Sequence, residues 1–132
     1  MTAPDSPTEK FAAYRYPDPV TRHLEGVERI GALLLAAGAS SRMGSPKALL
    51  AWDGRPLIQH QLAILGQVQF ASVVVVLGHD ESAISAAIRP DPNLRLAYNP
   101  LHARGRSSSV RLGVHLLGEL DAILIVNVDQ PL

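Results

Sequence analysis

The amino-acid sequence predicts an α/β fold in which a mostly parallel sheet is covered by helices on both faces, as a three-layer α/β/α sandwich. Two observations lead to this prediction. Short apolar runs recur along the chain, and the segments between them place apolar residues at helical spacing. Strands that alternate with helices need crossover connections, and these connections make neighbouring strands parallel with helices packed on the sheet.

Four strands are predicted from the apolar runs, at residues 29–37, 72–77, 94–98 and 122–128. The first run has almost no polar interruption, and the second reads Ser-Val-Val-Val-Val-Leu. Continuous runs of this kind are typical of strands that are buried on both faces of a parallel sheet.

Three helices are predicted between these strands. The first has Pro56 as its first helical residue, because proline suits that position. The second is capped by the side chain of Asp80 and stops at Pro90, and the third covers residues 107–117. The inward-facing residues are predicted to be Ile58, Leu62 and Leu65 in the first helix, Ile84, Ala87 and Ile88 in the second, and Val110, Val114 and Leu117 in the third.

Composition and charge exclude several classes of protein. The chain has 132 residues, which suits one domain, and 12 basic residues balance 12 acidic ones. No overall field therefore favours nucleic acid or a membrane surface, and we expect neither as a partner. The absence of cysteine excludes disulfides, thiolate metal ligands and a cysteine nucleophile. No apolar run approaches the ~18 residues of a membrane-spanning helix, and we expect a cytoplasmic protein.

The chain divides into a tail and a folded part. Residues 1–26 are polar and interrupted by Pro4, Pro7, Pro17 and Pro19, which predicts a flexible N-terminal tail. Residues 27–132 carry the regular pattern. Because the sequence stops just after the fourth strand and would leave that strand without cover, we expect a truncated part of a longer α/β domain.

The loop after the first strand has the composition of a phosphate-binding loop. Ala36, Ala37 and Gly38 lack bulk, so that a ligand could approach the backbone closely. Arg42 could bind phosphate oxygens through its planar guanidinium, and Lys47 supplies a compact second charge. The alternative for either cation alone is a solvated surface charge.

Two familiar phosphate loops do not match. A Walker loop has four residues between its glycines and a lysine directly after the second, whereas Gly38 and Gly44 are separated by Ala-Ser-Ser-Arg-Met, and Lys47 comes later. The dinucleotide-binding fingerprint needs glycine at position 40, which is Ser40. The sequence therefore indicates a different phosphate loop.

Ligands of parallel sheets bind beyond the carboxyl ends of the strands. Three polar segments follow predicted strands, at residues 38–47, 99–109 and 129–130, and we expect them to converge on one crevice. Asp129 follows a buried strand and could hold Mg²⁺ between phosphates, although an aspartate in this position is also a common turn former.

The serines of the second polar segment are further candidates. Ser107, Ser108 and Ser109 stand at the expected start of the third helix, where a serine caps the helix and where anions are favoured. Simple capping would need one serine, so contact with a base or ribose is the second possibility. No pair of histidines has a strong metal-binding spacing, and no nucleophile–base dyad is evident.

Together these segments resemble a known group of enzymes. "LAAGASSRMGSPKALL", at residues 35–50, resembles the signature loop of nucleotidyltransferases with a glycosyltransferase-A-like, Rossmann-type fold. "GRSSSVRLGV", at residues 105–114, and "VNVDQPL", at residues 126–132, are similar to segments of the molybdenum cofactor cytidylyltransferases. This resemblance covers about residues 30–132 and implies the nucleotide-binding part of such a domain.

The resemblance also implies roles for individual residues. Arg42 would hold the β- and γ-phosphates, Lys47 would meet the α-phosphate, and Asp129 would ligate Mg²⁺. Arg42 and Lys47 would therefore be the catalytic pair. The residues implied to contact the base, the ribose or the nucleotide side of the site are Leu35, Ala36, Ala37, Gly38, Asn99, Ser107, Ser108 and Ser109.

The reaction implied by the resemblance transfers CMP from CTP to a molybdopterin-type cofactor and releases pyrophosphate. A molybdenum hydroxylase is a possible recipient of the product. In-line transfer of this kind relies on positioning and charge stabilisation, so no protein nucleophile is needed. Two alternatives remain open: a related guanylyl- or sugar-phosphate nucleotidyltransferase, and a truncated, non-catalytic module that binds nucleotide or cofactor.

Overall fold

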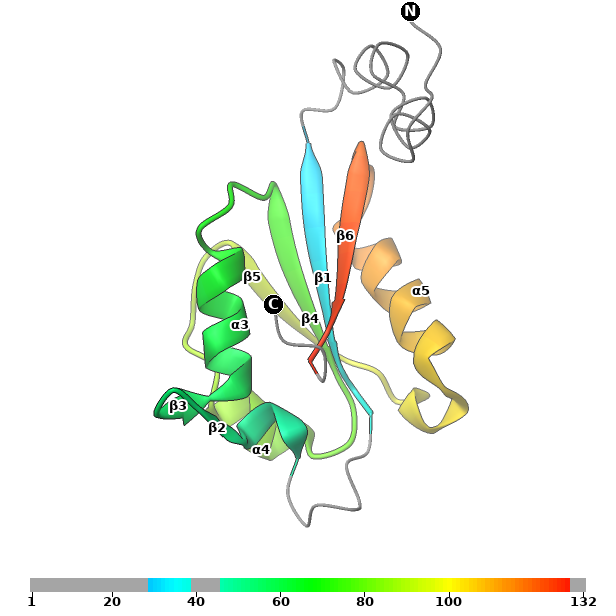
Figure 1. Cartoon of the computed structure of the whole chain (residues 1–132). Coiled ribbons are helices and arrows are strands. Elements are labelled where there is room, and N and C mark those ends of the chain that lie inside the picture. Colours follow the sequence, from blue (N-terminus) through cyan, green and yellow to red (C-terminus); the bar gives the residue numbers. More distant parts are fainter. Residues whose placement is uncertain (1–28, 39–45, 129–132) are drawn as a thin grey trace, which may run out of the picture.

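A computed structural model describes residues 29–38 and 46–128 of the chain. It confirms an α/β fold with a parallel four-stranded sheet in the order β5-β4-β1-β6 (Figure 1). The strands are β1 (Ile30–Ala36), β4 (Ser72–Leu77), β5 (Leu94–Tyr98) and β6 (Ala122–Asn127). The helices are α3 (Leu57–Leu65), α4 (Glu81–Ala86) and α5 (Arg106–Leu117), with short 3-10 turns η2 (Lys47–Leu49) and η3 (His102–Arg104).

The order of the strands places β1 in the interior of the sheet. The chain runs outward from β1 to β4 and β5, and α5 then returns it across the sheet to β6 on the other side of β1. The register is continuous on both sides, since Leu34 lies opposite both Val75 and Val126. The strand order therefore reverses between β1 and β6. The predicted tail of residues 1–26 lies outside the described residues.

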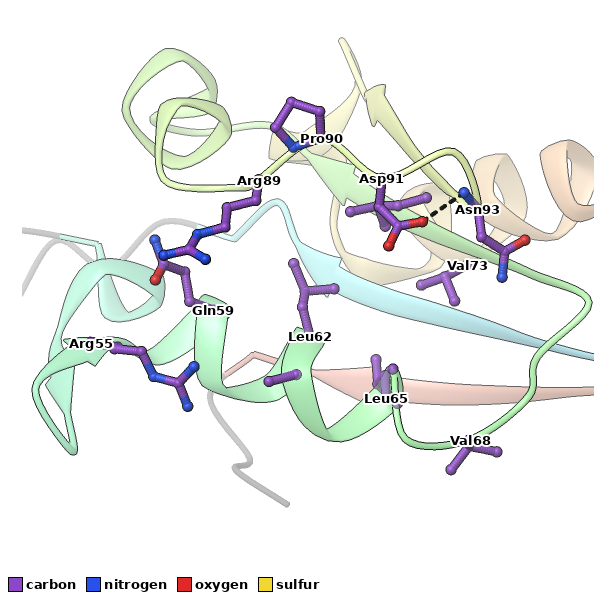
Figure 2. Close-up of a pocket in the computed structure, with 13 residues that line it drawn as sticks. Arg55, Gln59, Leu62, Leu65, Val68, Val73, Arg89, Pro90, Asp91 and Asn93 are labelled. Atoms are coloured by element: carbon purple, nitrogen blue, oxygen red, sulfur yellow. Dashed lines mark hydrogen bonds between the residues drawn. The ribbon is translucent and has the colours of Figure 1, made fainter.

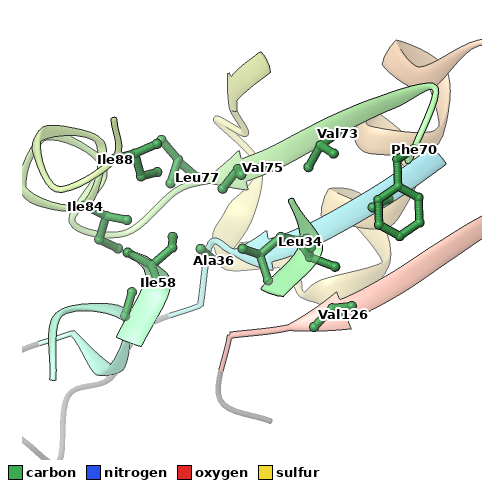
Figure 3. Close-up of a cluster of buried hydrophobic side chains, with 13 residues drawn as sticks. Leu34, Ala36, Ile58, Phe70, Val73, Val75, Leu77, Ile84, Ile88 and Val126 are labelled. Carbon is green, nitrogen blue, oxygen red and sulfur yellow. The ribbon is translucent and has the colours of Figure 1, made fainter. Parts of the chain in front are cut away.

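Alternate residues of β1 enter two separate hydrophobic cores. Leu34 joins the core beneath α3 and α4, where Ile58 and Ile84 are also buried (Figure 3). Leu33 and Leu35 join the core beneath α5. Because both faces of the strand are covered, its sequence is apolar throughout instead of alternating between apolar and polar residues.

The packing of α5 differs from the prediction. Val114 was expected to face the sheet, but its side chain is 40% exposed, and Gly113 takes the buried position. A Cβ atom at Gly113 would overlap the side chain of Leu33 on β1. The absence of a side chain thus lets the helix approach the strand closely, which no count of apolar residues reveals. The inward positions Val110 and Leu117 are confirmed.

Three predicted helix starts are also corrected. Leu57 is the first residue of α3, and Pro56 precedes it in an extended conformation. Asp80 precedes α4 with a left-handed backbone (φ 59°) and makes no side-chain cap, because its carboxylate lies 3.3 Å from Nε2 of His79. The serines do not cap α5: Gly105, with φ 113°, takes that position, and they follow Arg106 in the first turn.

The second helix also ends earlier than expected. Its last helical residue is Ala86, not the residue before Pro90, although Ile84 and Ile88 are buried as predicted. A short antiparallel hairpin, β2 (Ala51–Trp52) and β3 (Arg55–Pro56), precedes α3 and was not anticipated. Within the described part of the chain, every helix is too short or too polar to cross a membrane.

Candidate functional site

The carboxyl ends of the four strands are joined by backbone hydrogen bonds at one edge of the sheet. The N–H of His79, after β4, donates to the carbonyl of Ala37, after β1, at 3.2 Å. The N–H of Asn99 donates to Leu77 at 2.7 Å, and that of Val128 donates to Leu35 at 3.1 Å. Gly38 and Asn99, the first residues of two predicted polar segments, thus lie at this edge, whereas residues 129–130 lie outside the described residues. In such sheets ligands bind beyond the carboxyl ends of the strands where the strand order reverses, and that reversal lies here between β1 and β6.

The residues at the end of β1 can offer backbone groups but little side-chain surface. The side chains of Leu35, Ala36 and Ala37 are nearly inaccessible, with 6%, 3% and 5% exposure, because they pack into the two cores. Gly38 is exposed, and a Cβ atom there would have no neighbour within 4 Å. A ligand that contacts this segment would therefore meet mainly the open side of Gly38, because Leu35 and Ala36 are paired in the sheet. Contact of these residues with a base or ribose remains a prediction.

Replacement of Gly38 by alanine separates folding from ligand binding. The added methyl group has space in the structure, so the melting temperature is expected to change by less than about 2 °C. If a nucleotide lies against the backbone here, the methyl group will lift it away and weaken Kd by about tenfold, as isothermal titration calorimetry can measure. Gly66→Ala, at the end of α3, is the matched control. An unaltered Kd for Gly38→Ala would show that nucleotides do not approach this residue.

Lys47 lies on an anchored turn. It is the first residue of η2 and is exposed, whereas the next residue, Ala48, is 1% exposed and belongs to the core beneath α3. Pro46 precedes the turn in an extended conformation. The turn connects through the β2–β3 hairpin to α3, where the N–H of Leu57 donates to the carbonyl of Leu50 at 2.8 Å. Because the neighbouring residue is buried in the core, the backbone of Lys47 is positioned more precisely than that of a residue in an irregular loop.

Asn99 is the centre of a buried polar cluster. Its side chain is 3% exposed, and its amide nitrogen donates to the hydroxyls of Ser108 and Ser109, each at 2.9 Å. Its side-chain oxygen accepts the N–H of Leu101 at 2.9 Å. The structure thus brings three predicted site residues together, but their polar groups bind one another and tie the end of β5 to the start of α5. Ser107 is exposed outside this cluster.

Three aromatic rings gather at the same edge and were not predicted as a group. The ring centroid of His102 lies 6.3 Å from that of His79 and 6.3 Å from that of Tyr98. His79 follows β4, and His102 is the first residue of η3. Gly78 makes their approach possible, because a Cβ atom there would overlap His102 and the carbonyl oxygen of Ala37. Such rings offer flat surfaces on which a planar group could stack.

Two predicted site residues, Arg42 and Asp129, lie outside the described residues. Across residues 29–38 and 46–128, no cluster of three or more His, Cys, Asp or Glu side chains could hold a metal ion. Val128 is nevertheless held beside β1 by its hydrogen bond to Leu35, and Asp129 is the next residue in the chain. Ligation of a metal ion by Asp129 remains a prediction.

A parallel sheet of this order, with a loop of small residues after its central strand, defines an α/β domain of the nucleotide-binding type. The family model of the MobA-like NTP transferase domain matches residues 32–132. The chain belongs to this family.

Curated relatives come from two kinds of nucleotidyltransferase. The chain is 36% identical over 110 residues to the bifunctional protein GlmU of Bordetella parapertussis, in a match that covers 78% of this chain and 24% of that protein. It is 38% identical over 100 residues to a molybdenum cofactor guanylyltransferase of Xanthomonas euvesicatoria, covering 76% of this chain and 47% of the relative. The chain therefore spans between a quarter and a half of these relatives' lengths.

Solved structures agree with the fold. A nucleotidyl transferase from Methanothermobacter thermautotroptrophicus superposes with a TM-score of 0.70 at 28% identity, over 79% of this chain and 52% of that one. The Rv0371c protein of Mycobacterium tuberculosis superposes with a TM-score of 0.67 at 28% identity, over 80% of this chain and 53% of that one. A manganese complex of Rv0371c has the same fold, with a TM-score of 0.56 at 23% identity.

Proposed function

We propose that this chain is the nucleotide-binding part of a molybdenum cofactor cytidylyltransferase, which transfers CMP from CTP to a molybdopterin-type cofactor. The observation that supports the proposal most strongly is the position of β1, whose carboxyl end is followed by Ala37 and Gly38. β1 lies beside β6, where the strand order reverses, and the match to the nucleotidyltransferase family begins within β1.

The proposed reaction is an in-line displacement at the α-phosphate of CTP. A terminal phosphate oxygen of the cofactor attacks the α-phosphorus, a new phosphorus–oxygen bond forms, and the bond to the β-phosphate bridging oxygen breaks. Pyrophosphate leaves with the electron pair of that bond. Charge grows on the phosphate oxygens during this step, so fixed cations accelerate it.

The residues divide this work by position. Main-chain groups from Leu35 to Gly38 would hold the nucleoside, and Lys47, on its anchored turn, would stabilise the charge that develops at the α-phosphate. Arg42 would bind the β- and γ-phosphates, and Asp129 would ligate Mg²⁺. When bound, the metal ion would neutralise phosphate charge and orient the leaving group. The ordered cluster around Asn99 would hold the first turn of α5 beside the nucleotide.

The base specificity is tested by thermal stabilisation with nucleotides. A saturating ligand at about 100 times its Kd stabilises the folded state by about 2.7 kcal/mol, which corresponds to a shift of several degrees in melting temperature. CTP with Mg²⁺ is expected to raise the melting temperature more than GTP or UTP with Mg²⁺. Equal shifts, or a larger shift with GTP, would reject the assignment of cytosine. Each nucleotide without metal serves as the control.

A second candidate is a related guanylyl- or sugar-phosphate nucleotidyltransferase. It is favoured by the named relatives, since the guanylyltransferase and GlmU match three quarters of the chain. Incubation of the protein with labelled CTP or GTP and candidate acceptors, followed by product analysis, separates these reactions. If no acceptor leads to pyrophosphate release but nucleotide still raises the melting temperature, the chain is a binding module without transferase activity.

A further inference from the structure

A second pocket lies on the α3 side of the sheet and extends along α3 from its first turn. It has a volume of about 440 Å³ and lies between α3 and the connection at residues 87–93, which joins α4 to β5 (Figure 2). Val73 and Leu94, at the amino-terminal ends of β4 and β5, form part of its lining. The other end of the pocket, at Arg55 and Gln59, lies at the start of α3, on the side toward which the strands point (Figure 2).

The pocket exists because α4 is short. With six residues, α4 is only about 9 Å long and cannot cover the length of the strands beneath it. The chain then continues through Pro90 to β5 without helical structure. The remaining space beside α3 is lined by Leu62, which is half-buried, and by Val68, which is 54% exposed. These side chains leave an apolar wall that an apolar group could cover, and the volume suits a small organic ligand.

The charges of the pocket are separated along its length. Arg55, from β3, and Arg89 lie on either side of Gln59 at one end, as Figure 2 shows. Asp91 lies toward the other end, where its carboxylate accepts the N–H of Asn93 at 2.7 Å. Within residues 29–38 and 46–128, neither guanidinium has an acidic partner within salt-bridge distance. Gln59 is held in place by the bond from its amide nitrogen to the carbonyl of Ala87, at 2.7 Å.

We propose that this pocket binds a small organic anion, in which an aryl ring or short alkyl chain carries a phosphate, sulfonate or carboxylate group. The anionic group lies between Arg55 and Arg89, whose planar guanidinium groups match its oxygen atoms. The apolar part lies along Leu62 and over Val73 and Leu94. The pocket would thus be a second ligand site on the same domain, and displacement by CTP tests whether it is separate from the nucleotide site.

The test uses the fluorescence of anilinonaphthalene sulfonate, which has a sulfonate on an apolar aromatic body. Saturable binding is expected, with competition by phenyl phosphate and without displacement by saturating CTP and Mg²⁺. The double variant Arg55→Ala with Arg89→Ala is expected to weaken binding by at least about tenfold. Arg29→Ala, an exposed arginine outside the pocket, is the matched control and should leave the Kd unchanged.

A second variant tests the apolar part of the pocket without changing its charge. Ala63 lines the pocket on the exposed side of α3, so phenylalanine there should fill the space without disturbing the core. Ala63→Phe is expected to abolish saturable probe binding at an unchanged melting temperature. The proposal is overturned if wild-type protein shows no saturable binding, if the double arginine variant binds as tightly as wild type, or if CTP displaces the probe. None of these outcomes affects the nucleotide shift that tests the transferase assignment.

Discussion

Replacement of Lys47 by alanine is expected to lower kcat for cytidylyl transfer by about two to three orders of magnitude, while KM for CTP rises less than about tenfold. The reason is that the proposed partner of Lys47 is the α-phosphate, where negative charge increases between the bound substrate and the transition state. An interaction that strengthens at that point contributes to kcat more than to binding. Pyrophosphate release from CTP in the presence of the acceptor measures both constants.

The chain offers a matched control for this substitution. Its other lysine is Lys10, in the predicted N-terminal tail, and Lys10→Ala should leave kcat and KM unchanged. Ala48, beside Lys47, anchors the turn in the core, so Lys47→Ala should still fold, and its melting temperature is measured beside kcat to show this. An unchanged kcat for Lys47→Ala would show that Lys47 is not a catalytic residue. A variant with raised KM alone would indicate a role in ground-state binding.

Replacement of Asn99 by alanine is expected to destabilise the fold by about 3 kcal/mol, with a fall in melting temperature on the order of 10 °C. The substitution removes the donors to Ser108 and Ser109 and the acceptor for the N–H of Leu101. Ser109 is 3% exposed, so the loss occurs where water cannot readily replace the bonds. Urea denaturation followed by circular dichroism measures the free energy of unfolding.

Two further variants distinguish the cluster from a general effect of losing an asparagine. Asn93 is exposed and donates from its side chain to the carbonyl of Phe70, so Asn93→Ala should cost only about 1 kcal/mol. Asn99→Asp keeps the size of the side chain but replaces both N–H donors with a buried carboxylate, and it should destabilise the fold as well. A free energy of unfolding for Asn99→Ala within about 0.5 kcal/mol of wild type would contradict the structural role of the cluster.

β1 and β4 could be predicted from the sequence because burial on both faces produces continuous apolar runs, of which residues 72–77 are the plainest. The apolar runs of β5 and β6 also correspond to strands, although these two strands are largely exposed. Helix faces were less predictable. Gly113 is buried because the helix needs a small residue where it meets Leu33, and hydrophobicity alone favours Val114 for that position. The position of such a close contact depends on how the helix packs against the strand. The sequence of the helix alone does not contain this information.

A local signal for the β2–β3 hairpin was present in the sequence. Asp53 and Gly54 separate the two short strands, both with positive φ angles of 55° and 78°, and Asp-Gly is a favoured pair for a tight hairpin turn. The strands contain two residues each, so the alternation that normally identifies a strand is absent. The sequence shows that polar residues are present in the candidate site. It does not show that Asn99 bonds to Ser108 and Ser109, because that contact depends on the tertiary fold.

The pairing of β1 with β6 has a consequence for the order of folding. Beside these strands, the N–H of Arg29 donates to the carboxylate of Asp121, across 92 positions of the sequence. Contacts so distant along the chain form slowly, because the entropy of closing a long loop must be lost before the contact stabilises the fold. β1, β4 and β5 are closer together in the sequence and can pair earlier. The pairing of β1 with β6 is therefore expected late in folding. The nucleotide site proposed at the carboxyl ends of these strands would form late as well, so nucleotide binding is expected to develop only after the two strands have paired.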